Sequence, residues 1–419
     1  MRQSLDDWLT YVSALHPIAW DLTLDRVKTV ATRLDVLRPA PTVILVAGTN
    51  GKGSCCEAIS WLAVDSGRRV GLSTSPHLQQ FNERIRIDGE RVTDQAIVAA
   101  FESIDRVREE ISLSYFEFSC LAALLIFKGA ELDVAVLEIG LGGRLDAMNI
   151  VDPDLAVILP IALDHQDYLG DDREAIGREK AGILRSDRPL ILADPDPPAS
   201  IIAEAQRLSA PVFKINNDFH WREEEVQWTD LSGKVRQVEQ GHWPLKLPQT
   251  SLAAAVQAMS LLAGVESDAI SGLKDLTLLG RMTNVRVGEV TVYVDVAHNP
   301  HAAEHLANRL RETGTRSFRA VVGMYADKDA QGVLGALAPL VSDWFLAAVD
   351  ESRALAPKQL RLALPDSAQE TAKICPGISA ALAKALTNCP QSEAIIVFGS
   401  FPVVGEALEY LARQDQTGS

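Results

Sequence analysis

Short apolar runs alternate with amphipathic stretches along the first half of the chain. Each run is continuously apolar, as expected of strands buried on both faces of a parallel sheet. Apolar positions spaced by three or four residues separate the runs, and also occupy residues 5–15 and 21–37, where they indicate helices. The predicted strands cover residues 43–47, 69–74, 134–139, 154–161 and 189–193. This order predicts a doubly wound α/β domain.

The same rhythm returns in the last third of the chain. Strands are predicted near residues 290–296, 318–324, 343–349 and 394–399, with helices between them. Before them, residues 212–247 contain scattered tryptophans and a Ser232-Gly233 turn, which indicate a small antiparallel β insertion, and residues 249–263 form a helical pattern. We therefore expect two domains. The first is the doubly wound α/β domain over residues 1–284 with the insertion near 212–247, and the second is a smaller Rossmann-like α/β domain over residues 285–419.

The first predicted strand leads into a glycine-rich turn with one lysine and one terminal hydroxyl. Residues 48–54 read Gly-Thr-Asn-Gly-Lys-Gly-Ser. Backbone N–H groups of such a turn converge on phosphate oxygens, Lys52 adds positive charge, and the Ser54 hydroxyl is a suitable Mg²⁺ ligand. The loop departs from the common P-loop, because Val46 replaces its first glycine and Gly53 follows the lysine. Nucleotide binding is favoured over an unliganded turn because lysine and hydroxyl occur together, so we expect the N-terminal doubly wound domain to be P-loop ATPase-like.

Polar residues also follow other predicted strands, at the edge where parallel sheets bind ligands. Ser75 follows the second strand, Glu138 lies near the end of the third, and His165 follows the fourth. A carboxylate at a strand tip can hold Mg²⁺ opposite a phosphate loop, and a neutral imidazole can bind a metal with Asp164 orienting it. The alternatives are an exposed glutamate beside a mobile glycine-rich turn and a histidine without a metal.

Three further cations have ambiguous patterns. Arg84 and Arg86 follow the Ser75 segment, and either could bind an anionic substrate, although solvated arginines on a surface strand fit equally well. Lys180 lies within a helix predicted over residues 171–185, where a solvated position is the default for a lysine.

Composition narrows the classes of function. The chain has 419 residues, of which 47% are hydrophobic and 23% charged, as in ordinary globular proteins. Its 56 acidic and 40 basic residues give a formal charge of −16, which disfavours a broad nucleic-acid surface. No apolar run reaches the ~18 residues that span a bilayer, and no signal pattern is visible, so we expect a cytoplasmic enzyme without a membrane partner. The five cysteines lack metal-type spacing and are expected to be reduced.

Several motifs together resemble the bacterial folylpolyglutamate synthase/dihydrofolate synthase family, which belongs to the Mur-ligase-like ATP-dependent amide ligases. The resemblance extends over essentially the whole chain, and the unusual phosphate loop is similar to the form this family uses. It is carried by residues 48–54, 75–78 (Ser-Pro-His-Leu), 115–118 (Tyr-Phe-Glu-Phe), 137–146 (Leu-Glu-Ile-Gly-Leu-Gly-Gly-Arg-Leu-Asp), 162–165, 178–182, 279–281 and 295–300.

The resemblance implies a reaction and its cofactors. ATP would phosphorylate the carboxylate of a pteroate or folate, and the amine of L-glutamate would displace phosphate to form an amide. The expected metal is Mg²⁺, bound as two ions. Lys180 matches a position that carries a carbamate, and Lys52, Lys180 and His298 are the expected catalytic residues. The expected nucleotide contacts are Thr49, Asn50, Gly51, Lys52, Gly53, Ser54, Arg281 and Asp295, and the expected metal ligands are Ser75, Glu138 and His165.

The resemblance also places the acceptor. The pterin is expected against residues 14–17 and two further segments, with Phe116 stacking on it. These segments contain Ser114, Tyr115, Phe116, Glu117, Leu145, Asp146 and Ala147. At one nucleotide contact the family commonly has Asn, where this chain offers Ser251 or Gln249. The pterin segments favour an enzyme with both synthase activities. Its substrates would be small molecules, and we expect a monomer.

Two other functions remain open on the sequence. A Mur-type cell-wall amino-acid ligase would share the phosphate loop and residues 295–300. A nucleotide-binding switch without amide chemistry would explain the loop alone, but the polar strand ends of the second domain argue against it.

Overall fold

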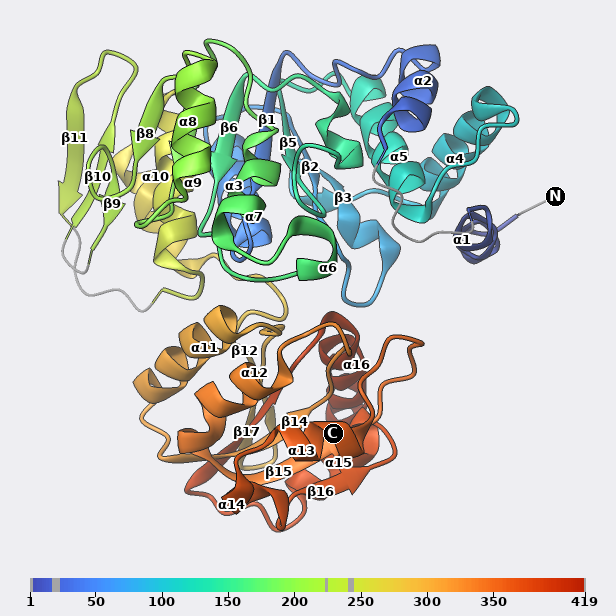
Figure 1. Ribbon diagram of the computed structural model, residues 1–419, viewed down its shortest axis with the longest axis vertical. Helices are drawn as coiled ribbons and strands as arrows, with labels where there is room; N and C mark the ends of the chain where they lie inside the picture. The colour runs from blue at the N-terminus through green and yellow to red at the C-terminus, as the bar shows by residue number, and fades with distance from the viewer. Residues whose placement is uncertain (1–2, 17–22, 223–224, 240–244, 418–419) are drawn as a thin grey trace. The chain divides into compact units, whose positions relative to one another are not determined.

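The structure is a computed structural model, and it describes residues 3–16, 23–222, 225–239 and 245–417 (Figure 1). The chain divides into two units, Met1–Leu276 and Thr277–Ser419. The pattern predicts a boundary slightly later, after residue 284. The difference arises because Thr283–Val287 forms a strand, β12, that belongs to the sheet of the second unit.

The first unit is built on an eight-stranded sheet with the order β4-β3-β2-β5-β1-β6-β7-β8. The neighbouring strands β2, β5, β1, β6, β7 and β8 run parallel to one another. Strands β3 and β4 form an antiparallel edge beside β2. All five predicted strands are present, so the doubly wound α/β prediction is confirmed. The strands are β1 (Thr42–Ala47), β2 (Val70–Ser73), β3 (Ile85–Ile87), β4 (Glu90–Arg91), β5 (Val134–Glu138), β6 (Leu155–Ile158), β7 (Leu190–Leu192) and β8 (Val212–Lys214).

Helices cover both faces of this sheet (Figure 1). Val43 and Leu45 of β1 belong to a core that includes residues of α2, α4, α5, α7 and α8, whereas α3 and α9 pack against each other on the opposite face. The helices are α1 (Leu5–Ala14), α2 (Asp25–Arg33), α3 (Lys52–Asp65), α4 (Asp94–Arg108), α5 (Tyr115–Gly129), α6 (Gln166–Leu169), α7 (Arg173–Ala181), α8 (Ala199–Arg207), α9 (Gln249–Ser260) and α10 (Ser267–Gly272), with 3₁₀ turns η1 (Phe81–Arg84), η2 (Ala147–Ile150) and η3 (Leu273–Asp275).

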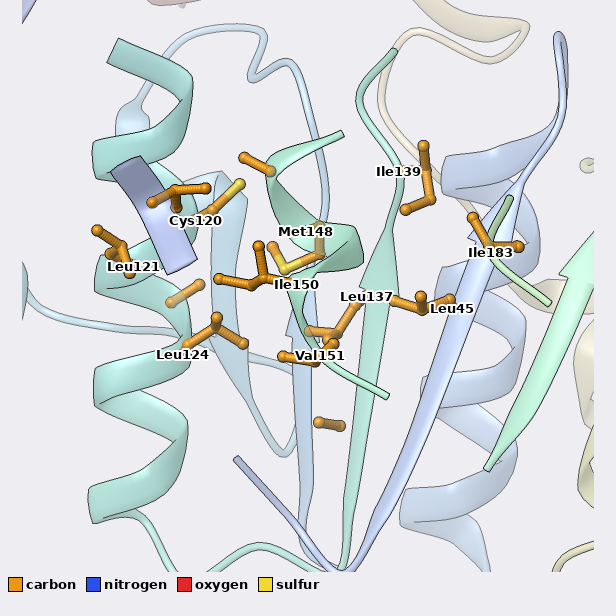
Figure 2. Packing of buried hydrophobic residues seen from close by; sticks show 14 of the residues in the cluster. Leu45, Cys120, Leu121, Leu124, Leu137, Ile139, Met148, Ile150, Val151 and Ile183 are labelled. Carbon is orange, nitrogen blue, oxygen red and sulfur yellow. The ribbon is translucent and has the colours of Figure 1, made fainter. Parts of the chain in front are cut away.

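The core explains why the polar strand ends are held rigidly. Figure 2 shows Leu124 of α5, Ile150 of η2 and Leu137 of β5 packed in one apolar layer, and all three are buried. Because Leu137 precedes Glu138 directly, this layer fixes the strand tip that carries the carboxylate.

The insertion is a three-stranded antiparallel sheet with the order β11-β10-β9. Its strands are β9 (His220–Trp221), β10 (Glu225–Thr229) and β11 (Val235–Glu239). Trp221 and Trp228 are buried and serve its local core. Residues 212–214, expected within this insertion, instead form the edge strand β8 of the main sheet, because they pair in parallel with β7.

The second unit repeats the α/β order around a six-stranded sheet, β12-β13-β17-β14-β15-β16, in which only β12 is antiparallel to its neighbour. All four predicted strands are present. The strands are β12 (Thr283–Val287), β13 (Val290–Val294), β14 (Ser317–Val322), β15 (Val341–Ala347), β16 (Lys373–Cys375) and β17 (Glu393–Phe398), and the helices are α11 (Pro300–Glu312), α12 (Ala330–Leu337), η4 (Ala338–Leu340), α13 (Pro357–Ala363), α14 (Asp366–Gln369), α15 (Ile378–Leu386) and α16 (Phe401–Thr417).

Two surface and redox features complete the description. None of the described helices is long and apolar enough to cross a membrane. The five cysteines are free thiols, and all except Cys389 are buried.

Candidate active site

The strand order of the first unit gathers the polar strand ends at one edge. Strands β2, β5, β1 and β6 are neighbours and run in parallel, so the segments after them emerge side by side. The backbone N–H of Ser75 donates to Oε2 of Glu138 over 3.0 Å. Glu138 is only 6% exposed and pairs in register with Val46, just before the phosphate loop. The structure thus places Ser75, Glu138 and the phosphate loop together.

The phosphate loop has the backbone shape of an anion site. Gly51, with φ +85°, caps the 14-residue helix α3 in the left-handed conformation, and no side chain of a described residue caps this helix end. Lys52 folds back over the loop, where Nζ donates to the carbonyl oxygens of Gly48 at 3.1 Å and Thr49 at 3.2 Å. An uncapped helix N-terminus beside an ammonium fits bound phosphate.

Two hydroxyls hold this loop in place. The Thr49 hydroxyl exchanges hydrogen bonds with the backbone of Ala162, at 3.0 Å from its N–H and 3.1 Å to its carbonyl oxygen, and the Thr49 N–H donates to Pro160. The buried Ser251 donates from Oγ to the Gly51 carbonyl oxygen over 3.1 Å, whereas Gln249 is exposed at the start of α9. Thr49 and Ser251 therefore contact protein backbone, and the expected Thr49 contact with nucleotide stays a prediction.

Ser54 lies deeper than its expected role as a ligand suggests. The residue is 0% exposed, and its Oγ has no hydrogen-bond partner within the described part of the chain. Buried hydroxyls without a partner are uncommon. A group bound at the N-terminus of α3 would supply one, so the orphaned hydroxyl fits a nucleotide-metal site.

The expected metal ligands form an incomplete shell. His165 has a left-handed backbone, with φ +52°, and its N–H donates to Asp164 Oδ1 at 2.9 Å, while its Nε2 lies 3.9 Å from the same oxygen. Across the described residues, no three His, Cys, Asp or Glu side chains converge on a metal position. Mg²⁺ commonly takes one or two protein carboxylates together with water and substrate phosphates, so a set built on Glu138, His165 and Ser75 fits it.

Lys180 is buried rather than solvated. It is 4% exposed, and Nζ donates to the Gly48 carbonyl oxygen over 2.9 Å, which joins α7 to the phosphate loop. Burial and, secondarily, the nearby Lys52 ammonium lower the pKa of the Lys180 amine to about 7. A solvated helix face, the default for this lysine, is therefore wrong.

The seven expected pterin residues divide into two groups. Ser114 and Glu117 form a capping box at the start of α5, and Arg26 donates to Glu117 at 3.1 Å. Tyr115, Phe116 and Leu145 are half-buried and offer side-chain surface to a ligand, whereas the other four residues are buried. Those four are Ser114, Glu117, Asp146 and Ala147.

The environment of Phe116 and Asp146 is tightly defined. A Cβ at Gly140 would lie 2.4 Å from Cζ of Phe116, so the ring packs directly on the backbone after β5. Asp146 accepts from the N–H groups of Leu141 at 2.8 Å and Met148 at 2.9 Å, and burial raises the pKa of its carboxyl to about 6. The expected segment 14–17 ends at Pro17, which lies outside the described residues.

The second unit holds the remaining expected residues. Asp295 follows β13 and accepts from the N–H groups of Met282 and Ala297, both at 2.9 Å. Burial raises the pKa of the Asp295 carboxyl, whereas the nearby Arg281 acts in the opposite direction. The His298 Nδ1 lies 2.8 Å from the Val296 carbonyl oxygen, which requires a proton on Nδ1 and leaves the lone pair of a neutral ring on Nε2.

One pair of positioning residues, Arg173 and Asp194, was not predicted from the sequence. Asp194 accepts the Ile161 N–H over 2.8 Å, and Arg173 donates from Nε to the Ile161 carbonyl oxygen over 3.0 Å. The two side chains also pair with each other at 3.2 Å. They fix the segment that leads to His165. The available signal was the position of Asp194, directly after the predicted strand 189–193.

Comparison with known proteins gives this geometry a family. The Mur ligase middle domain matches residues 46–251, and the Mur ligase glutamate ligase domain matches residues 280–401. The dihydrofolate synthase/folylpolyglutamate synthase of Escherichia coli strain K12 is 40% identical over 420 residues, which cover 99% of this chain and 97% of that protein.

Solved structures agree with the sequence relatives. E. coli FolC in complex with DHPP and ADP is 38% identical and superposes with a TM-score of 0.91 over 99% of both chains. A bifunctional folylpolyglutamate synthase/dihydrofolate synthase with Mn, AMPPNP and L-glutamate bound is 39% identical, with a TM-score of 0.89 over 98% of both chains. The chain therefore belongs to the dihydrofolate synthase/folylpolyglutamate synthase family of Mur ligases, as its motifs predicted.

Proposed function

We propose that this chain is an ATP-dependent ligase that joins L-glutamate through an amide bond to dihydropteroate and to folates. The observation that carries the proposal is the convergence of the phosphate loop, Glu138 and Lys180 at one sheet edge, joined by hydrogen bonds to Ser75 and Gly48. The relatives and complexes named above are folate ligases, which favours this function over a Mur-type cell-wall ligase.

The first half-reaction makes an acyl phosphate. One oxygen of the acceptor carboxylate attacks the γ-phosphorus of ATP, and the bond to the β–γ bridging oxygen breaks to release ADP. Because two anions approach each other, their alignment and the neutralisation of charge contribute more than a general base. The uncapped N-terminus of α3 and Lys52 would bind the phosphates.

The metal fits the oxygen and nitrogen groups at this edge. Ser75, Glu138 and His165 would hold it, and Mg²⁺ when bound supplies charge neutralisation between phosphate and carboxylate. The carboxylate of Glu138 is already oriented by the Ser75 N–H, so it loses little freedom on binding.

A carbamate on Lys180 would add a further anion to this shell. Only a neutral amine reacts with carbon dioxide, and the lowered pKa of Lys180 keeps much of the amine neutral near pH 7. Because Nζ contacts Gly48, the new carboxylate would lie beside the phosphate loop.

The second half-reaction forms the amide. The glutamate amine attacks the acyl carbon, the bond between that carbon and the bridging oxygen breaks, and inorganic phosphate leaves. We assign His298 to this step, because the neutral ring has its lone pair on Nε2 and can accept a proton from the amine. Arg281 and Asp295 are assigned to ATP, and the expected monomeric state stays a prediction.

The experiment is ADP release by the purified full chain with ATP and Mg²⁺, with one substrate omitted at a time. ADP release should require both L-glutamate and an acceptor, and mass spectrometry should show the glutamylated acceptor. Dihydropteroate and tetrahydrofolate are tested separately to assign the two activities. If neither acceptor supports ADP release, or if a UDP-linked cell-wall precursor is turned over faster, the proposal is refuted.

A further inference from the structure

Arg84 and Arg86 occupy very different environments, although the sequence offers both as anion-binding groups. Arg86 on β3 forms an ion pair with Glu57 of α3, with Nη1 2.9 Å from Oε2. Its charge is therefore already neutralised by the protein. Arg84, at the end of η1, has no ion pair with any described residue, and the one hydrogen bond of its side chain to them runs from Nε to Nδ1 of His77 over 2.8 Å.

The guanidinium of Arg84 lies in a corner made by two aromatic rings. Its Cζ is 5.5 Å from the centroid of the Tyr115 ring and 5.6 Å from that of Phe81. The two rings stand perpendicular, with an interplanar angle of 90°. Together with the His77 contact, they fix the plane of the guanidinium and leave its terminal amino groups for another acceptor.

This environment favours the arrival of an anion. Burial lowers the pKa of Arg84, against smaller opposing effects of Tyr115, Glu138 and Glu83. A cation that has lost part of its water without gaining a carboxylate is destabilised, and a bound carboxylate would compensate it through paired hydrogen bonds. The His77 Nδ1 can accept the hydrogen bond from Arg84 only when the imidazole ring is neutral. His77 therefore adds no positive charge that would compete for the anion.

Arg84 also lies between the two parts of the proposed site. Its carbonyl oxygen accepts the Thr74 N–H at 3.1 Å, next to Ser75, whose N–H binds Glu138. On the other side, Tyr115 directly precedes Phe116, the expected stacking partner of the pterin. The backbone of Arg84 thus contacts the segment that leads to Ser75, and its guanidinium contacts Tyr115 of the expected acceptor segment.

We propose that Arg84 binds the carboxylate of the pteroate or folate acceptor and presents it for phosphorylation, with His77, Phe81 and Tyr115 orienting the guanidinium. The inference rests on the proposed function and assigns to one residue the recognition of the group that reacts.

Binding of two matched acceptors tests this assignment. Calorimetry with Mg²⁺ and AMPPNP would measure dihydropteroate and its uncharged carboxamide against the wild type, Arg84→Gln and the control Arg91→Gln. Arg91 lies on β4, in the hairpin that directly follows Arg84, and pairs with Glu83 at 3.8 Å. Arg84→Gln should lower the affinity for dihydropteroate at least tenfold and the affinity for the carboxamide less than threefold. Arg91→Gln should change neither.

Three outcomes would overturn the proposal. An equal loss of affinity for both acceptors would indicate that Arg84 has a purely structural role. An unchanged affinity for dihydropteroate would exclude a contact between Arg84 and the carboxylate. Weaker AMPPNP binding with intact discrimination between the acceptors would assign Arg84 to the γ-phosphate. If Arg84→Gln does not fold, Arg84→Lys, which keeps the charge but loses the planar fork, should show a smaller selective loss. Wild-type ADP release with both substrates separates failure of this inference from failure of the proposed function.

Discussion

Among single residues, the two lysines that donate to the phosphate loop, Lys52 and Lys180, differ in what surrounds them. Lys52 is half-buried, and its ammonium binds two loop carbonyl oxygens. Lys180 is almost fully buried and binds one of the same carbonyl oxygens, that of Gly48. Burial, and secondarily the nearby Lys52 ammonium, lowers the pKa of Lys180, so this amine loses its proton more readily.

This difference predicts a pH-dependent carbamate. Because the pKa of Lys180 is lowered to about 7, the neutral amine, and with it the carbamate, should increase as pH rises from 6 to 8. Carbon-13 NMR of protein equilibrated with labelled carbon dioxide, at one fixed dissolved concentration, should show a carbamate signal several-fold stronger at pH 8. Lys180→Gln is the control and should show none of this signal.

Activity provides a second readout for the same residue. Lys180→Ala should lower kcat by about 10²–10³-fold, as for removal of one charge-stabilising group, and short carboxylates should restore part of it. A wild-type spectrum without the signal, or one identical to that of Lys180→Gln, would contradict the carbamate.

Residue roles could be predicted only where chemistry follows directly from residue type and position. The placing of Ser75 and Glu138 follows from strand order, because parallel strands end at one edge. The capping box of Ser114 and Glu117 is a local pattern over three residues, whereas the pairing of Arg86 with Glu57 depends on packing between distant segments. The sequence pattern contains no direct record of such contacts.

At the scale of elements, the phosphate loop depends on α9. A Cβ at Gly51 would lie 2.5 Å from Oγ of Ser251, and φ at Gly51 is +85°. Gly67, in the turn after α3, has a similar φ of +78° but no atom within 4 Å of a built Cβ. The two glycines thus separate backbone strain from steric overlap.

Alanine substitutions should reveal the difference. Gly67→Ala should cost about 1 kcal/mol of unfolding free energy and leave KM for ATP unchanged. Gly51→Ala should cost more and raise KM for ATP by about tenfold or more, because the loop must move from α9. Denaturant unfolding and steady-state kinetics measure the two effects.

A double variant completes this experiment. Gly51→Ala with Ser251→Gly removes the steric overlap and should recover part of the ATP affinity. Equal effects of Gly51→Ala and Gly67→Ala on KM for ATP would show that α9 does not shape the loop.

The elements themselves were largely predictable from apolar runs. The central strands of both sheets are continuous and buried, so periodicity identifies them. Three strands that were not predicted, β4, β12 and β16, are edge strands with weaker burial. Strand β8 was assigned to the wrong sheet because its three residues are only half-buried. A short half-buried strand gives no periodic signal strong enough to identify its partner.

At the scale of the whole molecule, the residues expected to act in the reaction are distributed over two α/β units. The first unit carries the phosphate loop, the expected metal ligands and the acceptor segments, and the second carries Arg281, Asp295 and His298. In the proposed reaction, ATP converts the acceptor carboxylate into an acyl phosphate. One oxygen atom of that carboxylate then leaves with phosphate, so its fate tests the reaction directly.

The decisive measurement follows oxygen-18 from dihydropteroate labelled at both carboxylate oxygens. During turnover with ATP and L-glutamate, one labelled oxygen should appear in inorganic phosphate for each amide formed, and the other should remain in the amide carbonyl. Mass spectrometry of both products gives this ratio. Amide formation accompanied by unlabelled phosphate would contradict the account.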